Sequence, residues 1–233
     1  MADTTYLKEK ELYADSIEFS YRASHQLLTG VYISCKVGEV VALLGRNGCG
    51  KSTLMKILFG VLSPKHAYIT LHGRRIIKPF VSQEVCYLPQ QRFLPTHKTV
   101  QQMITFMLRS PEQRAAVAKD EVIANVLTQK IADLSVGEVR YLELSLLLHQ
   151  QATFYLLDEP FSGVSPYLKE QIQQLIDRYR GTKGFIISDH HYRSVLDICS
   201  KIILLQNGGC RLITDKKELE YFYVPEGTFD AGE

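Results

Sequence analysis

The stretch that decides the fold lies in the first quarter of the chain and reads Gly45-Arg46-Asn47-Gly48-Cys49-Gly50-Lys51-Ser52-Thr53. It follows an apolar run at residues 39–44 and precedes a segment of helical character at residues 54–59. A strand, a glycine-rich loop and a helix in immediate succession match the phosphate-loop pattern G-x-x-x-x-G-K-[ST]. The alternative is a glycine-rich turn that caps an ordinary helix, but the strand and helix on either side favour a phosphate loop.

Each residue type in this loop suits the binding of phosphate. Glycine lets the backbone wrap closely around an anion, in conformations that side chains would forbid. Backbone N–H groups at the start of a helix then meet the anion at the positive end of the helix dipole. We expect Lys51 to bridge the outer phosphates and the Ser52 hydroxyl to hold Mg²⁺. The loop from Gly45 to Thr53 therefore predicts a nucleoside-triphosphate site.

Composition narrows the class of protein. The 233 residues are long for one compact domain, so we expect a catalytic lobe with an inserted or appended subdomain. The net charge of +2 is too small to indicate binding to nucleic acid or to an anionic membrane. Five cysteines without paired spacing argue against a disulfide framework and favour a reduced, cytoplasmic compartment. Since no apolar run approaches the roughly 20 residues of a membrane span, we expect any membrane role to depend on a partner.

Polar residues follow two of the predicted strands. The apolar runs 153–157 and 184–188 are typical of buried parallel strands; Asp158 and Glu159 follow the first, and His190 lies just after the second. Ligands of open α/β sheets bind beyond the carboxyl ends of the strands. We expect Asp158 to hold Mg²⁺ through water, Glu159 to orient and deprotonate the attacking water, and a neutral His190 to hydrogen-bond the γ-phosphate. A solvated turn is the alternative at both positions.

Two single residues gain meaning from their position. Gln90 follows a short strand at residues 85–88, where an amide could reach a metal or a water without adding charge. Tyr21, at the end of an alternating strand predicted at residues 16–21, lies upstream of the phosphate loop, and its ring could stack on a purine base. A solvated glutamine and a surface tyrosine are the alternatives.

The middle of the chain changes to helical periodicity. Residues 100–107 and 115–127 are amphipathic, which predicts a small helical subdomain inserted between strands. Ser135 then precedes a helix predicted at residues 139–148, whose N-terminus is a second candidate anion site. The alternative is structural, because Ser135 as N-cap and Glu138 three residues later would form a capping box.

Taken together and in this order, the motifs resemble those of the ATP-binding cassette ATPases that drive membrane transporters. The resemblance spans roughly residues 14–214. The matching segments are the first nucleotide motif (Gly45 to Thr53), the base-stacking aromatic (Tyr21), the Q-loop (Gln90), the signature motif (Leu134 to Glu138), the second nucleotide motif (Tyr155 to Glu159), the D-loop (Ser162 to Ser165) and the switch histidine (His190).

The resemblance implies a fold and a function. The expected fold is an α/β P-loop NTPase with a mixed sheet core, an N-terminal antiparallel β subdomain and a helical subdomain inserted at about residues 95–150, all within one nucleotide-binding domain over residues 1–233. The expected function is binding and hydrolysis of ATP with Mg²⁺, by a subunit that lies on the cytoplasmic face of a membrane through separate membrane-embedded subunits. No nucleic acid is expected. The membrane partner would dock near Gln90 to Pro95 and the helical segment after Thr99.

The resemblance also implies a dimer. Ser135 and Gly137 of one cassette would face the γ-phosphate bound by the other, so that ATP joins a homodimer or a pair of cassettes head to tail.

Residues 159–166 and 188–193 look like the stand-alone cassettes of lipopolysaccharide export and branched-chain amino-acid import. Soluble cassettes of DNA repair, translation or assembly, and a degenerate ATP-binding scaffold, are the alternatives; the absence of a basic face argues against the first, and intact Lys51 and Glu159 against the second.

Four positions qualify these expectations. Val136, Glu138 and Ser165 depart from the glycine, glutamine and aspartate of the family motifs, so we expect hydrolysis that is slow or depends on a partner. Cys49 lies beside Lys51 at a predicted helix N-terminus, an environment that can lower a thiol pKa and would suit a redox role.

Overall fold

The computed structural model describes residues 10–22 and 25–229. The buried apolar runs of the sequence form a mixed sheet of six strands in the order β10-β9-β3-β8-β7-β6. All neighbouring pairs are parallel except β9 and β10, which form an antiparallel hairpin. The strands are β3 (Val40–Leu44), β6 (Val85–Leu88), β7 (Phe154–Asp158), β8 (Gly184–Ser188), β9 (Lys201–Gln206) and β10 (Gly209–Ile213).

A second sheet is antiparallel, in the order β2-β1-β4-β5. Its strands are β1 (Glu11–Arg22), β2 (His25–Lys36), β4 (His66–Leu71) and β5 (Arg74–Arg75). Strand β1 is longer than the alternating strand predicted at residues 16–21, because the β1–β2 hairpin pairs Glu11 with Lys36 and Arg22 with His25, carrying the ladder past the apolar residues at both ends. The expected α/β fold with a mixed core sheet and an N-terminal antiparallel part is confirmed.

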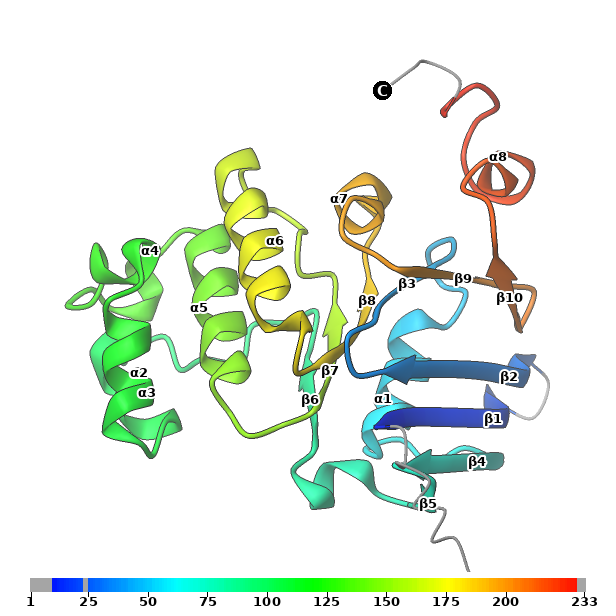
Figure 1. Cartoon of the computed structure of the whole chain (residues 1–233), viewed down its shortest axis with the longest axis horizontal. Helices are drawn as coiled ribbons and strands as arrows, with labels where there is room; N and C mark the ends of the chain where they lie inside the picture. The colour runs from blue at the N-terminus through cyan, green and yellow to red at the C-terminus, as the bar shows by residue number, and fades with distance from the viewer. Residues whose placement is uncertain (1–9, 23–24, 230–233) are drawn as a thin grey trace, which may run out of the picture.

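Alternating side chains of the larger sheet enter two different cores. Val41, Leu43 and Leu156 face α1 (Lys51–Phe59) and the antiparallel sheet, whereas Ala42 and Leu157 face the helices on the other side. A strand buried on both faces must be apolar at every position, which explains the continuous apolar runs in the sequence. Figure 1 shows the resulting order, with the antiparallel sheet at one end of the molecule and α2 to α4 at the other.

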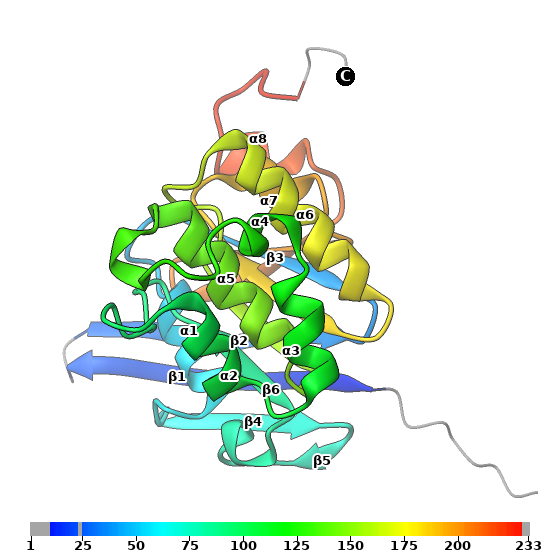
Figure 2. The same cartoon turned by 90° about the vertical axis from the view of Figure 1, so that its left-hand side faces the viewer.

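The helical part of the chain faces the viewer in Figure 2. Its elements are α2 (Val100–Met107), α3 (Pro111–Ala118), α4 (Glu121–Ala124), η2 (Ile131–Asp133) and α5 (Val136–Leu148). The single helix predicted at residues 115–127 is wrong, since α3 ends at Ala118 and α4 starts separately. Asp120 causes the break: its carboxylate accepts from the N–H groups of Val122 and Ile123 as an N-cap.

The helix that follows Ser135 of the signature motif starts earlier than its apolar pattern predicts. Helix α5 begins at Val136, not at residue 139, because Ser135 and Glu138 form the capping box that was the structural alternative for this segment. Ser165 likewise caps α6 (Pro166–Arg180), accepting from the N–H of Leu168 over 3.4 Å. The remaining elements are η1 (Pro79–Ser82), α7 (Tyr192–Leu196) and α8 (Glu218–Phe222).

The topology gathers the candidate residues at one edge of the larger sheet. Strands β3, β7 and β8 are parallel neighbours, so their carboxyl ends meet at the edge where α7 lies (Figure 1). The phosphate loop leaves β3 there, Asp158 closes β7, and His190 follows β8. Asp158 is itself the last residue of β7, paired with Ser188, rather than the first residue after the strand.

Candidate nucleotide site

The phosphate loop is held against the sheet by glycines that no other residue could replace. Gly45 has φ of 152°, and a Cβ there would lie 2.4 Å from the carbonyl oxygen of Leu205 and 2.7 Å from Cys49 Sγ. Gly50, the N-cap of α1, has φ of 111°, and a Cβ there would lie 2.9 Å from a methyl group of Leu28. Both positions combine a left-handed backbone with close contact, which only glycine tolerates.

The loop presents donors for an anion. Lys51 is buried, and its Nζ donates to the carbonyl oxygens of Gly45 at 2.6 Å and Arg46 at 3.2 Å, both in its own loop. In the described chain, no side chain caps the N-terminus of α1, so the first N–H groups of the helix lack the partner that helix ends usually have. This arrangement suits a bound phosphate, which would take those N–H groups and the lysine ammonium.

Asp158 is a buried carboxylate between two hydroxyls. Its side chain is 1% exposed; Oδ1 accepts from Ser188 Oγ at 2.7 Å, and Oδ2 accepts from the Tyr87 hydroxyl at 3.0 Å. Burial, followed by the Asp158 charge, raises the pKa of Tyr87, so this phenol stays a donor. Because both partners are neutral, the carboxylate charge suits a nearby cation, and Mg²⁺ prefers oxygen ligands of this kind.

Glu159 lies where three segments meet. Its Oε2 accepts from Gln90 Nε2 at 2.9 Å and lies 3.5 Å from His190 Nδ1. Its backbone has φ of 53°, an uncommon conformation for a residue with a side chain. Asp189, fully buried, accepts from the N–H groups of Phe161 and His191, each at 2.8 Å, and so fixes the loops that follow β7 and β8. The structure therefore brings together Glu159, Gln90 and His190, as the sequence predicted.

Tyr21 reaches the same site from the antiparallel sheet. Its hydroxyl lies 3.0 Å from Thr53 Oγ1 in the first turn of α1, and its ring contacts the edge of Phe19 at 4.8 Å between centroids. The side chain remains 65% exposed. An exposed aromatic face beside the phosphate loop is compatible with base stacking, which stays a prediction.

Ser135 and Gly137 lie elsewhere. Helix α5 packs on the face of the larger sheet opposite to α1, so the structure does not bring these two residues to the phosphate loop of the same chain. Ser135 is exposed, and Gly137 lies against Val164 and Leu168. Val136, exposed at the helix start, contacts the D-loop: its Cγ1 would lie 3.2 Å from a Cβ on Gly163.

The expectation of a lowered thiol pKa at Cys49 is wrong. Burial raises the pKa of Cys49 above its ordinary value, and the opposing effects of Lys51 and of backbone N–H groups are smaller. The thiol is half-buried beneath the loop, beside a small cavity of about 130 Å³ that Tyr223 and Phe222 help to close. Desolvation of the thiolate therefore outweighs the helix dipole that the sequence argument invoked.

Sequence reasoning missed four residues that hold this site. Tyr87, Ser188 and Asp189 hydrogen-bond Asp158 or the adjacent loops, and Arg140 donates to backbone carbonyls at the end of β7. Tyr87 and Ser188 follow apolar residues in strands, Asp189 comes directly after β8, and none of the three carries a spacing signal. Arg140 does carry one, since an arginine among the apolar residues Val139, Tyr141 and Leu142 of a predicted helix needs a partner if it is buried.

Comparison with known proteins assigns the family. A family model described as "ABC transporter" matches residues 28–162, which is more than half of the chain. The chain belongs to the ABC transporter family.

Relatives and solved structures agree with this assignment. The cassette is 32% identical over 213 residues to the lipopolysaccharide export system ATP-binding protein LptB of Haemophilus influenzae, covering 84% of this chain and 87% of that protein. LptB of Acidithiobacillus ferridurans is 32% identical over 212 residues, with the same coverage. The fold matches a solved ATP-binding subunit of an ABC transporter with a TM-score of 0.79 at 21% identity, covering 90% of this chain and 92% of that one.

The cassette is thus the ATP-binding subunit of an ABC transporter, and the resemblance found in its motifs is confirmed. ABC cassettes pair with membrane permease subunits. In the part of the cassette that the structure describes, no helix is both long and apolar enough to cross a membrane. The assignment favours a transporter over the alternative of a cassette acting in DNA repair, translation or assembly.

Proposed function

We propose that the cassette hydrolyses ATP and that Glu159 is the general base. The observation that carries this proposal is the convergence of Gln90 and His190 on one oxygen of Glu159, at 2.9 and 3.5 Å. A carboxylate that is oriented by an amide and an imidazole can accept a proton from a water held beside it. Gln90 would position that water, and His190 would hydrogen-bond the γ-phosphate, so both assist the attack on phosphorus.

The substrate would be held by the loop on the other side of the site. We infer that Lys51 leaves its own loop carbonyls to bridge the outer phosphates, while the N–H groups of the loop and of α1 bind the remaining oxygens. The Ser52 hydroxyl, Gln90 and, through water, Asp158 would hold Mg²⁺, which neutralises phosphate charge when bound. The ring of Tyr21 would stack on the purine base of the nucleotide.

A complete site needs a second cassette. Ser135 and Gly137 are on the opposite face of the sheet from their own phosphate loop, so they would serve the ATP of a partner copy or paired cassette in a head-to-tail dimer. In the capping box Ser135 Oγ accepts from the N–H of Glu138, so its O–H remains available to donate to a phosphate oxygen. With Val136 and Glu138 beside it, we expect turnover that is slow or depends on a partner.

Substitution of Glu159, the proposed general base, distinguishes an ATP-hydrolysing enzyme from a degenerate ATP-binding scaffold. The Glu159→Gln variant keeps the shape of the side chain but cannot accept a proton, so phosphate release should fall by about 10²- to 10⁴-fold while ATP binding is retained. Glu170→Gln is the matched control and should leave turnover unchanged, because Glu170 is an exposed carboxylate on α6 that accepts only from Gln174 among the contacts described. Equal phosphate release from Glu159→Gln and wild type would refute the role of Glu159, and no turnover in any protein would favour the scaffold.

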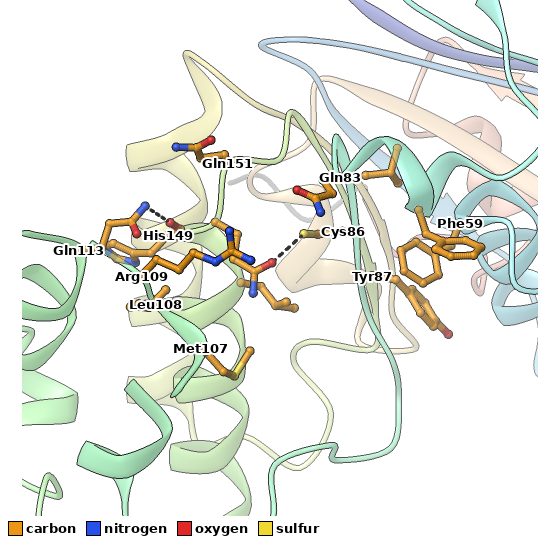
Figure 3. Close-up of a pocket in the computed structure, with 14 residues that line it drawn as sticks. Phe59, Gln83, Cys86, Tyr87, Met107, Leu108, Arg109, Gln113, His149 and Gln151 are labelled. Atoms are coloured by element: carbon orange, nitrogen blue, oxygen red, sulfur yellow. Dashed lines mark hydrogen bonds between the residues drawn. The ribbon is translucent and has the colours of Figure 1, made fainter. Parts of the chain in front are cut away.

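We further propose that the membrane partner docks in a groove beside β6. The groove has a volume of about 510 Å³ and lies between the edge strand β6 and the helical part, which we regard as the subdomain of residues 95–150 (Figure 3). Phe59, Tyr87 and Met107 line it together with Arg109, an exposed cation. A groove that combines aromatic and apolar side chains with glutamines and one cation suits a short amphipathic segment that carries an acidic residue.

The position of the groove refines the sequence expectation. It includes Met107 and Arg109 of the helical segment after Thr99, but its strand wall is β6 rather than residues 90–95. A partner docked there would hold the cassette on the cytoplasmic face of the membrane. Affinity capture tests this: Glu159→Gln protein loaded with ATP and Mg²⁺ should retain a multi-span membrane protein from detergent-solubilised membranes. Recovery of a soluble partner or of nucleic acid instead would contradict it.

A further inference from the structure

Arg140 is a buried cation inside the helix that carries the signature residues. It lies in the first half of α5 and is 5% exposed, whereas most other residues of that helix are apolar. A buried guanidinium must have its donors satisfied, since an unpaired buried charge is strongly unfavourable. Its partners therefore show what the helix is attached to.

The guanidinium donates to three backbone carbonyls from two strand ends. Nη1 donates to the carbonyl oxygen of Pro89, after β6, at 2.6 Å. Nη2 donates to the carbonyl oxygens of Asp158 and, at 3.1 Å, of Glu159. One planar side chain thus joins α5 to the residue before Gln90 and to the peptide that carries the proposed general base.

Glu143 completes the attachment one turn further along α5. It is fully buried; its Oε2 lies 3.4 Å from Arg140 Nη1, and its Oε1 accepts from the N–H of Phe93 at 2.8 Å. Arg140 and Glu143 therefore hydrogen-bond the backbone at Pro89 and at Phe93, on either side of Gln90. Both residues that converge on the attacking water in our proposal, Gln90 and Glu159, have their backbones tied to the same helix.

The Glu159 peptide depends on such contacts. Its left-handed φ of 53° persists only where neighbouring groups over-determine it. The N–H of Glu159 donates to the carbonyl of Ser188 at 2.7 Å, and its own carbonyl accepts from Arg140. Loss of the guanidinium would free the second of these contacts and let the carboxylate move.

We propose that Arg140 is a positioning residue that couples the signature end of α5 to Glu159 and Gln90 of the same chain. Ser135 and Gly137 lie about one turn before Arg140, so a displacement of the helix start on binding the partner's nucleotide is passed through a rigid helix to the guanidinium. The general base then adopts its working position only when the dimer is closed. This inference rests on the proposed hydrolysis by Glu159.

The test is steady-state ATP hydrolysis by Arg140→Gln and Arg140→Lys, with ATP affinity measured separately. Lys183→Met is the matched control, because Lys183 is a buried cation that donates to the carbonyls of Gln150 and Ala152 before β7, at the opposite end of the same strand. We expect Arg140→Gln to lower kcat by about 10- to 100-fold with KM and ATP affinity within roughly threefold of wild type. Arg140→Lys keeps the charge but not the forked guanidinium, so its kcat should lie between those of wild type and Arg140→Gln.

A general loss of stability would give a different result. It would lower the activity of Lys183→Met and Arg140→Gln alike, in proportion to the folded fraction measured by circular dichroism, and would overturn the proposal. So would a kcat within roughly threefold of wild type in folded Arg140→Gln. If Arg140→Gln does not fold, Arg140→Lys decides by the same criteria. Hydrolysis with Glu159 as general base is tested separately, because it requires that wild-type protein turns over ATP and that Glu159→Gln abolishes this turnover. A failure of the Arg140 proposal can therefore be told apart from a failure of the proposed function.

Discussion

The Tyr87 hydroxyl donates to Asp158 Oδ2 over 3.0 Å, while its ring forms part of the wall of the groove beside β6 (Figure 3). The ring also lies 5.6 Å from that of Phe59 at the end of α1. One side chain therefore contacts both the proposed docking groove and the carboxylate proposed to hold Mg²⁺ through water. A partner in the groove that displaced Tyr87 would therefore alter the hydrogen bonding of Asp158.

Removal of this hydroxyl should destabilise the protein. Tyr87→Phe keeps the ring but leaves a buried carboxylate oxygen without its donor, which costs about 1–3 kcal/mol of unfolding free energy. Urea denaturation without nucleotide measures the loss. Tyr32→Phe is the control, since the Tyr32 side chain is exposed and the Ser34 hydroxyl that it donates to keeps Lys201 as a donor, so its removal should change the unfolding free energy by less than about 0.5 kcal/mol. Equal stability of Tyr87→Phe and wild type would show that the Tyr87–Asp158 bond contributes nothing.

Charge reversal in the groove should separate docking from catalysis. Arg109→Glu places a negative charge where we propose an acidic residue of the partner, so the membrane protein should no longer co-purify. Nucleotide binding should be unchanged, because Arg109 lies on the helical side of the groove (Figure 3). Arg180→Glu, an exposed change at the end of α6, is the control and should leave capture intact. Undiminished capture by Arg109→Glu would place the partner elsewhere.

The signature position should respond to removal of its branched side chain. Val136→Gly restores the glycine of the family motif and removes the branched side chain that lies beside Gly163, so phosphate release should rise several-fold in the dimer. Its cost in helix stability is at most about 1 kcal/mol. Glu138→Gln tests the charge alone, because glutamine can still accept from the Ser135 N–H in the capping box. If Val136→Gly leaves turnover at the wild-type rate, the valine is not what slows the enzyme.

His149 should make stability depend on pH below neutrality. Burial lowers the pKa of His149. Its Nδ1 lies 2.8 Å from the carbonyl oxygen of Ser145, which only accepts, so Nδ1 carries the proton and Nε2 accepts from the Tyr179 hydroxyl at 3.0 Å. The unfolded chain binds a proton first as the pH falls below about 6.5, so His149 stabilises the fold above that pH and loses its contribution as the pH falls towards the folded pKa.

Urea unfolding at pH 7.5 and 5 measures this contribution. The unfolding free energy of the wild type should fall more than that of His149→Gln, by at most about 1.4 kcal/mol per pH unit for one proton. His66→Gln, at an exposed position, should follow the wild type. Parallel pH dependence of His149→Gln and wild type would mean that His149 is not the group responsible.

The sequence alone determined the local chemistry of the nucleotide motifs. Gly45 to Thr53 predicted its strand, loop and helix because the glycine conformations and the apolar runs are properties of short segments. The acidic end of β7 was predictable for the same reason, since a strand buried on both faces is apolar throughout and its end shows as the first charged residue. Order along the chain then sufficed to indicate the family.

Only the tertiary structure decided which residues hold those motifs in place. The thiol pKa of Cys49 depends on how deeply the loop is packed, which no neighbour in the sequence reveals. Arg140 and Pro89 are 51 residues apart in the chain and touch because α5 packs beside β6. Long-range packing sets burial and partners, and it is therefore what turns a row of motifs into a site.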